Sequence, residues 1–149
     1  MRHAYSRFGE PCKEFLTELS EELGLPHDKD HAFRVLRALF DIIRKHINPE
    51  QSFHLIETLP FCLKIVYVDH WTVQFHFETI NSQSEFKTAF LDAYGPEAIE
   101  DFVPTDKVII AIKDTFRVIG RHLDEVNKTE FFVALPMGAQ QLWEETVMV

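Results

Sequence analysis

The chain has little positive charge for its size. Its 149 residues include 15 Lys and Arg against 24 Asp and Glu, which gives a net charge of −9. A protein that binds nucleic acid neutralises phosphates with clustered Lys and Arg, and the sequence contains no such cluster. Direct binding to nucleic acid is therefore disfavoured, and so is attraction to an anionic membrane surface.

Glycine and cysteine are also scarce. With only five glycines, the chain has no Gly-rich phosphate-binding loop. Its two cysteines, Cys12 and Cys62, stand in separate amphipathic segments, and no C-x-x-C spacing indicates a redox pair or a zinc site. We interpret both as buried, reduced thiols of a cytosolic protein.

Long apolar runs are absent. The most apolar window, FCLKIVYV, is short and contains Lys64, so no segment is predicted to span a bilayer. The opening residues MRHAYSRFGEPCKEF lack the apolar centre of a signal peptide. We expect a cytoplasmic location.

What the chain does have is a repeated pattern. The segment KHINPEQSFHLIETLP at 45–60 returns in degenerate form as RHLDEVNKTEFFVALP at 121–136, an offset of 76 residues, and EFLTELSEELGL at 14–25 returns as EFKTAFLDAYGP at 85–96. The matched apolar positions are spaced i, i+3, i+4 and i+7, which is typical of an amphipathic helix. The pattern predicts two copies of one helical unit, at 12–68 and 83–146, with a connector at 69–82 in one compact domain.

The predicted fold class is all-α, with about eight helices in two pseudo-symmetric repeat units and one extended connector at about 68–80. Asn48 and Asp124 stand where an N-cap is expected, and Gly24 and Gly95 stand just after the first helix of each copy. The expected helices lie near 12–23, 30–47, 49–58, 60–68, 84–94, 105–123, 125–134 and 136–146.

The repeated letters also raise the question of a duplicated catalytic motif. His46 and His122 fall in the last turn of the long helix in each copy, where a hydrogen-bonding or cationic side chain suits the exposed carbonyls. No nucleophile or acid stands at matching positions of both copies. We interpret the repeat as architecture.

These segments resemble a known family. The sequence ELSEELGLP, the R-x-L-R-A-L-F helix at 34–40, ETLPFCLKIVYVDHW and the second-copy FRVIGRH…ALP…LWEE are similar to the bacterial family called domain of unknown function 2267. The resemblance covers roughly residues 12–145 and implies an all-α, internally duplicated protein. It carries over no catalytic residue. The chain departs from the family after Asp69, where relatives tend to have a polar loop with Gly or Pro.

One segment breaks the helical pattern. From Trp71 the chain alternates apolar and polar residues, with Val73, Phe75 and Phe77 on the same side as Trp71. This period of two is the only good strand signal in the sequence, and a lone strand leaves its backbone groups unpaired. Either the segment is a connector whose four apolar residues press into the groove between the halves, which we favour, or it pairs with a second subunit as a dimer strand. A hairpin with the preceding residues is a lesser alternative.

The polar residues near this segment are candidates for acid–base chemistry. Asp69, His70 and His76 lie close to Tyr67, and together they offer the material for an acid–base pair. No Ser or Cys nucleophile stands in register with them, however, so we predict no catalytic residue. His27 and His31 are four residues apart, but H-E-x-x-H is absent, and we predict no metal site and no cofactor.

The leading functional hypothesis is a non-enzymatic helical interaction module, with a homodimer as one form of it. The alternative is a protein that binds a small apolar or aromatic ligand in a pocket between the two units. An enzyme built on Asp69, His70 and His76 is a third hypothesis. The residues expected to form the interaction or pocket surface are Tyr67, Asp69, His70, Trp71, Phe75, His76 and Phe77.

Overall fold

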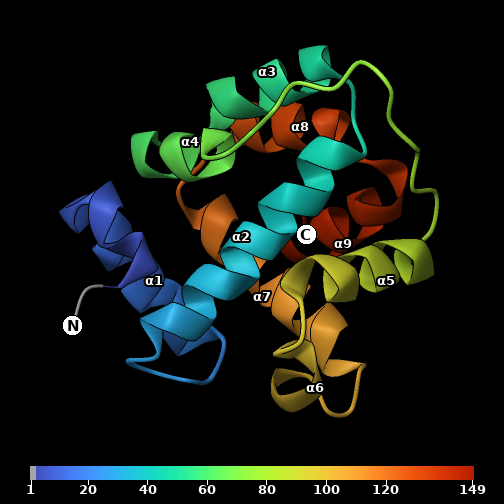
Figure 1. Cartoon of the computed structure of the whole chain (residues 1–149). Helices are drawn as coiled ribbons and strands as arrows, with labels where there is room; N and C mark the ends of the chain where they lie inside the picture. The colour runs from blue at the N-terminus through green and yellow to red at the C-terminus, as the bar shows by residue number, and fades with distance from the viewer. Residues whose placement is uncertain (1–2) are drawn as a thin grey trace.

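The computed structural model describes residues 3–149 and is all-α, as predicted, with no strand among those residues (Figure 1). A short 3₁₀ helix and nine α-helices follow one another within residues 3–149. They are η1 (Ala4–Phe8), α1 (Glu10–Glu22), α2 (Lys29–Lys45), α3 (Pro49–Thr58), α4 (Phe61–Val68), α5 (Gln83–Tyr94), α6 (Ala98–Asp101), α7 (Lys107–Arg121), α8 (Glu125–Ala134) and α9 (Met137–Val147).

The eight predicted helices are present, with ends that follow local capping chemistry. The Asn48 side chain accepts a hydrogen bond from the backbone N–H of Gln51, and the backbone N–H of Asn48 donates to the side-chain oxygen of Gln51, so α3 starts with a complete capping box. Asp124 caps α8 through the N–H of Asn127. The short elements η1 and α6 were not predicted, because four or five residues show no helical periodicity.

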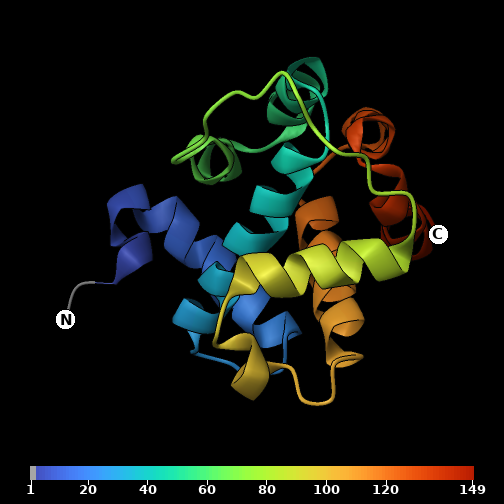
Figure 2. The same cartoon turned by 45° about the vertical axis from the view of Figure 1, so that its right-hand side comes forward.

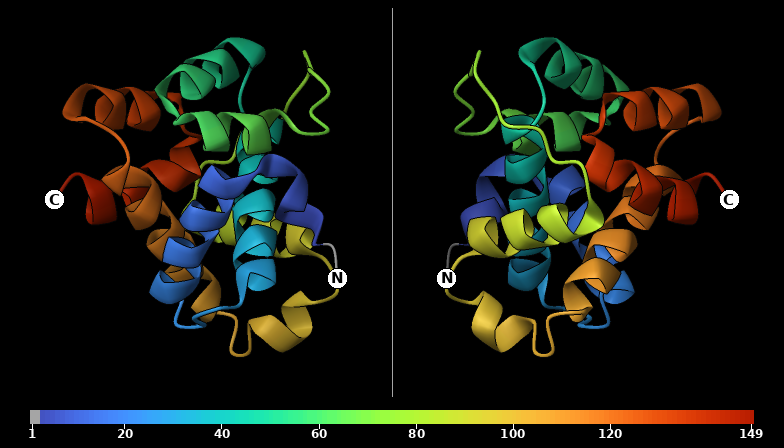
Figure 3. Two further views of the ribbon diagram at one scale, coloured as in Figure 1. Left: turned by 90° about the vertical axis from the view of Figure 1, so that its left-hand side faces the viewer. Right: turned by 90° about the vertical axis from the view of Figure 1, so that its right-hand side faces the viewer.

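Two long helices, α2 and α7, form the centre of the molecule (Figures 1 and 2). α2 packs against α1 and α5, α7 packs against α9 and α1, and α3 lies on α8. The largest side chains that the helices bury completely are aromatic: Trp143, Tyr67, Phe40, Phe86, Phe90, Phe116 and Phe131. Burial of these rings is the main source of stability for such a fold. The helix η1 and the end of α9 lie on opposite sides of the molecule in Figure 3.

Several contacts recur at the offset of 76 residues. Phe40 meets Tyr67 edge to face at a centroid distance of 5.2 Å, and Phe116 meets Trp143 in the same way at 5.3 Å. These correspondences favour the prediction of an internal repeat, as do the two N-caps. The division into two units stays a prediction.

The prediction for the cysteines was wrong. Cys12 of α1 and Cys62 of α4 form a disulfide with a Cα–Cα distance of 5.3 Å, and no free cysteine is left. Both are buried, as expected, but 50 residues separate them, and only the packing of α4 onto α1 brings them together. The cytoplasmic location therefore loses the support that it took from reduced thiols.

The prediction for the connector was wrong in one respect. Residues 71–81 are neither helix nor strand, and they arch over the surface from α4 to α5 (Figure 2). The four apolar residues are not pressed into a groove, because Val73, Phe75 and Phe77 are exposed and only Trp71 is half-buried. None of the helices within residues 3–149 has the length and apolar character needed to cross a membrane.

Candidate functional site

The predicted surface residues begin at the C-terminal end of α4, where Tyr67 is fully buried. Its hydroxyl lies 2.9 Å from the Ser52 hydroxyl, and its ring meets Trp71 edge to face at 6.1 Å. Burial raises the pKa of Tyr67, and the hydrogen bond with Ser52 and the charge of Arg44 offset this only in part. Tyr67 is therefore a neutral core residue that fixes Trp71, and it is not a proton donor to solvent.

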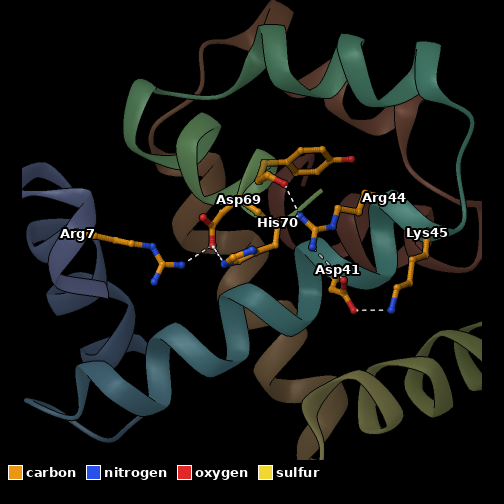
Figure 4. A network of polar contacts seen from close by, with 7 residues as sticks. Arg7, Asp41, Arg44, Lys45, Asp69 and His70 are labelled. Atoms are coloured by element: carbon orange, nitrogen blue, oxygen red, sulfur yellow. Dashed lines mark hydrogen bonds and ion pairs between the residues drawn. The ribbon is translucent and has the colours of Figure 1, made fainter. Parts of the chain in front are cut away.

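Arg44 of α2 closes the end of α4 (Figure 4). Its Nη1 donates to the carbonyl oxygens of Tyr67 at 2.7 Å and Asp69 at 2.9 Å, while its Nη2 donates to Asp41 at 3.1 Å. These carbonyls belong to the end of a helix, where they have no intrahelical partner and carry the negative end of the helix dipole. The arginine thus holds the turn in which the connector leaves the helical body.

Asp69 and His70 lie in that turn. The Asp69 carboxylate accepts a hydrogen bond from Arg7 of η1, and its Oδ2 lies 3.7 Å from Nε2 of His70 (Figure 4). His70 has a φ of 57° and its side chain is largely exposed. Asp69 is thus occupied by an arginine, which leaves it poorly placed to act as a general base.

Phe75, His76 and Phe77 lie further along the connector and face solvent. Phe75 is the most exposed of them, with 81% of its surface accessible. The connector is fixed at its far end, where the carbonyl of Ile80 accepts from the N–H of Gly138 at 2.9 Å. The structure therefore brings Tyr67, Asp69, His70 and Trp71 together and leaves Phe75, His76 and Phe77 as a separate exposed stretch.

A polar cleft of about 590 Å³ adjoins the Asp69–His70 turn. One wall is the outer face of α2, the second is the end of α4, and the third is the end of α5. It is lined by Phe33, Arg34, Arg37, Ala38, Asp41, Arg44, Lys45, Asp69, His70, Ala93, Tyr94 and Glu97. Sequence reasoning missed these arginines because it used only the apolar face of the long helix. Their spacing of three, seven and ten residues was the available signal.

The third wall of the cleft holds a hydrogen-bonded cluster. The hydroxyl of Tyr94 donates to Asp101, accepts from Nε of Arg34 at 3.3 Å and lies 3.1 Å from Nδ1 of the buried His31. Burial and the bond to Asp101 raise the pKa of Tyr94. Burial works to raise the pKa of Asp101 as well, but the hydrogen bonds from Tyr94 and Arg34 outweigh it and lower that pKa. The cluster ties α6 to α2 and α5.

The structure offers no metal centre within residues 3–149, since no three His, Cys, Asp or Glu side chains there are placed to hold an ion. His27 is exposed, whereas His31 is buried beside Tyr94, so the two do not form a pair. A second cavity, of about 240 Å³, lies between α3, the connector and the start of α9, and Phe77, Val133 and Met137 contribute to its walls.

Comparison with known proteins gives a family and no activity. A search of curated proteins finds no match. A family model described as "Uncharacterized conserved protein (DUF2267)" matches residues 12–142. The match includes the two long helices, the disulfide, the connector and every residue that lines the cleft. The chain therefore belongs to the DUF2267 family of uncharacterised conserved proteins.

Proposed function

We propose that the protein is a non-enzymatic helical interaction module that forms a symmetric dimer through residues 71–78 of its connector. The backbone groups of residues 72–79 make no backbone hydrogen bond with any residue in the range 3–149. Among these groups, only the carbonyl of Glu78 contacts a side chain of the described residues, that of His46. Unpaired backbone beside exposed aromatic rings is the usual template for strand addition. This exposed, unpaired stretch is the observation that carries the proposal.

A second copy of the chain is the occupant that fits the stretch. Antiparallel pairing centred on Gln74 sets Phe75 opposite Val73 of the partner and Phe77 opposite its Trp71. It also sets Glu78 opposite His70, so a carboxylate meets an imidazole at each end. Aromatic and β-branched pairs stabilise neighbouring strands by about 0.2 to 1 kcal/mol each, and a two-fold axis provides every pair twice.

The apolar surface extends beyond the connector. Phe53 of α3 is half-exposed and meets Trp71 edge to face at a centroid distance of 5.8 Å. The paired strands would therefore pack against the aromatic side chains of Phe53 and Trp71. This adds buried area to a contact that two strands alone would leave marginal.

The test compares the solution mass of the protein and three variants by light scattering over a range of concentrations. Gln74→Pro removes one backbone donor at the centre of the pairing, and Phe75→Glu places a charge in it; both should give monomers. Neither residue makes an internal backbone bond, so circular dichroism should show an unchanged fold. Ile99→Glu is the matched control, because Ile99 is 77% exposed on α6 and should leave the dimer intact. A wild-type protein that stays monomeric at every concentration would refute the proposal.

The second candidate is a binder of a small apolar ligand in the cavity between α3 and α9. Exposed apolar side chains of Phe77, Val133 and Met137 favour it. Its volume of about 240 Å³ is below the roughly 300 to 1,000 Å³ of ordinary ligand sites, which counts against it. A compound that copurifies with the protein and is lost in Met137→Glu would favour this candidate over the dimer.

A further inference from the structure

We propose that the cleft on the outer face of α2 binds a small organic anion through a carboxylate or phosphate group, and that Arg37 receives that group. This inference concerns a site away from the centre of the proposed dimer contact and does not depend on it. It rests on three observations: the charge of the cleft, the unpaired state of Arg37 and the contrast with the second long helix.

The cleft concentrates positive charge in an acidic protein. Arg34, Arg37 and Arg44, three of the seven arginines in the chain, line it together with Lys45. Of the lining carboxylates, Asp41 is bound by Arg44 and Lys45, and Asp69 is bound by Arg7. Only Glu97 is left as an exposed carboxylate without an ion pair to any residue from 3 to 149.

Arg37 is the group that is free to bind. It is exposed and makes no hydrogen bond or ion pair with any residue in the described chain, whereas Arg34 is held by Tyr94 and Asp101, and Arg44 by Asp41 and two carbonyls. A guanidinium offers a fork of donors that matches the two oxygens of a carboxylate or phosphate. The buried side chains of Phe33 and Ala38 lie in the same cleft and lower its polarity, which strengthens such a bond.

The second long helix, α7, carries a comparable cation that is neutralised by an ion pair. At the offset of 76 residues, Arg37 corresponds to Lys113 and Asp69 corresponds to Glu145. Lys113 Nζ lies 2.8 Å from a carboxylate oxygen of Glu145, so that pair is closed. Asp69, the residue that matches Glu145, is bound by Arg7 instead. Arg37 thus has no ion-pair partner among residues 3–149, and the volume of about 590 Å³ suits a small ligand.

The experiment titrates the protein with citrate, pyrophosphate and inorganic phosphate at constant ionic strength, followed by calorimetry and by backbone amide NMR. At least one probe should bind saturably and shift the amides of α2 and of residues 93–97. Arg37→Ala should weaken that binding at least tenfold, and the exposed Lys107→Ala should leave it unchanged. Citrate against the two phosphates then decides which anionic group is preferred.

Arg7→Ala provides a second variant that lies outside the cleft. The loss of Arg7 leaves Asp69 free to pair with Arg37. We therefore expect weaker anion binding, although no residue that lines the cleft has been changed. The proposal is overturned if no probe binds saturably, if Arg37→Ala binds as tightly as the wild type, or if the shifted amides lie away from the cleft.

Discussion

The two predicted repeat units place the same kinds of residue at matching positions, and these residues make different contacts. In the second unit, Lys113 of α7 and Glu145 of α9 form an ion pair across the surface. At the matching positions, Arg37 of α2 and Asp69 at the end of α4 line a cleft and are not bonded to each other, and Asp69 is bound to Arg7.

A second contrast lies at the start of the last helix of each unit. Leu59–Pro60 and Leu135–Pro136 have nearly the same extended backbone before α4 and α9. Two residues after each proline, however, the first unit has Cys62, bonded to Cys12, and the second has Gly138, against which the connector rests. The shared positions build the helices, and the differing positions fix α4 to α1 and α9 to the end of the connector.

The largest expected effect follows from removal of the disulfide that fixes α4 to α1. Replacing Cys12 and Cys62 with serine removes a bridge that spans 50 residues, and the chain-entropy estimate for such a loop is about 4 kcal/mol. The free energy of unfolding, measured with denaturant, should fall by about that amount. A reductant should lower the wild type to the same value and leave the double variant unaffected. Equal stability of wild type and variant would contradict the role assigned to the bridge.

Stability should depend nearly as strongly on the contact of Gly138 in α9 with the end of the connector. A Cβ added at Gly138 would lie 2.4 Å from the carbonyl oxygen of Ser82 and 2.6 Å from Ile80. Because the nearest atom is backbone, Gly138→Ala should cost about 3 kcal/mol and loosen the end of the connector. Gly24→Ala is an instructive control: it has open space, and its cost should come only from its φ of +79°. A Gly138→Ala protein with an unchanged melting temperature would show that the contact is not tight.

The smallest effect sharpens the contrast between the outer faces of α2 and α7. Asp101→Asn weakens the bonds from Arg34 and Tyr94 and should cost about 1.5 kcal/mol at neutral pH. Glu18→Gln, which faces Arg121 and His122 at a more exposed site, should cost about 0.5 kcal/mol or less.

The pH dependence of Asp101→Asn follows from the lowered pKa of the Asp101 carboxyl in the folded protein. A carboxyl whose folded pKa lies below its unfolded value adds stability above the unfolded value, and that stability is lost as the pH falls through the folded one. The difference in unfolding free energy between wild type and Asp101→Asn should therefore be full at neutral pH and shrink below about pH 4. A difference that grows under acid would contradict this assignment.

The helices were predictable from sequence because their signals are local. Asn48, Asp124 and the two Leu-Pro pairs mark helix ends within a few residues of where the structure has them. The disulfide was not predictable, since it depends on how α4 packs on α1, and Cys12 and Cys62 show no spacing rule. The repeat itself stays a prediction that the matched contacts favour.

The candidate site was predictable only in part, because the rest depends on contacts between residues that are distant in the chain. The alternating pattern from Trp71 to Phe77 correctly set this stretch apart from the helices, but period two cannot tell whether a strand has a partner. Tyr67 and Asp69 were predicted to belong to an interaction or pocket surface, yet Tyr67 is buried and Asp69 is bound by Arg7 from η1. The proposed anion site depends on Arg37 having no partner among residues 3–149, which is a property of the fold and not of the sequence near it.

Native mass spectrometry of freshly purified, untagged protein, set against its denatured mass, tests the proposed function most directly. We expect a complex of two chains for the wild type and for Ile99→Glu, and a single chain for Gln74→Pro. A single chain at every concentration, in the wild type as in the variants, would contradict it.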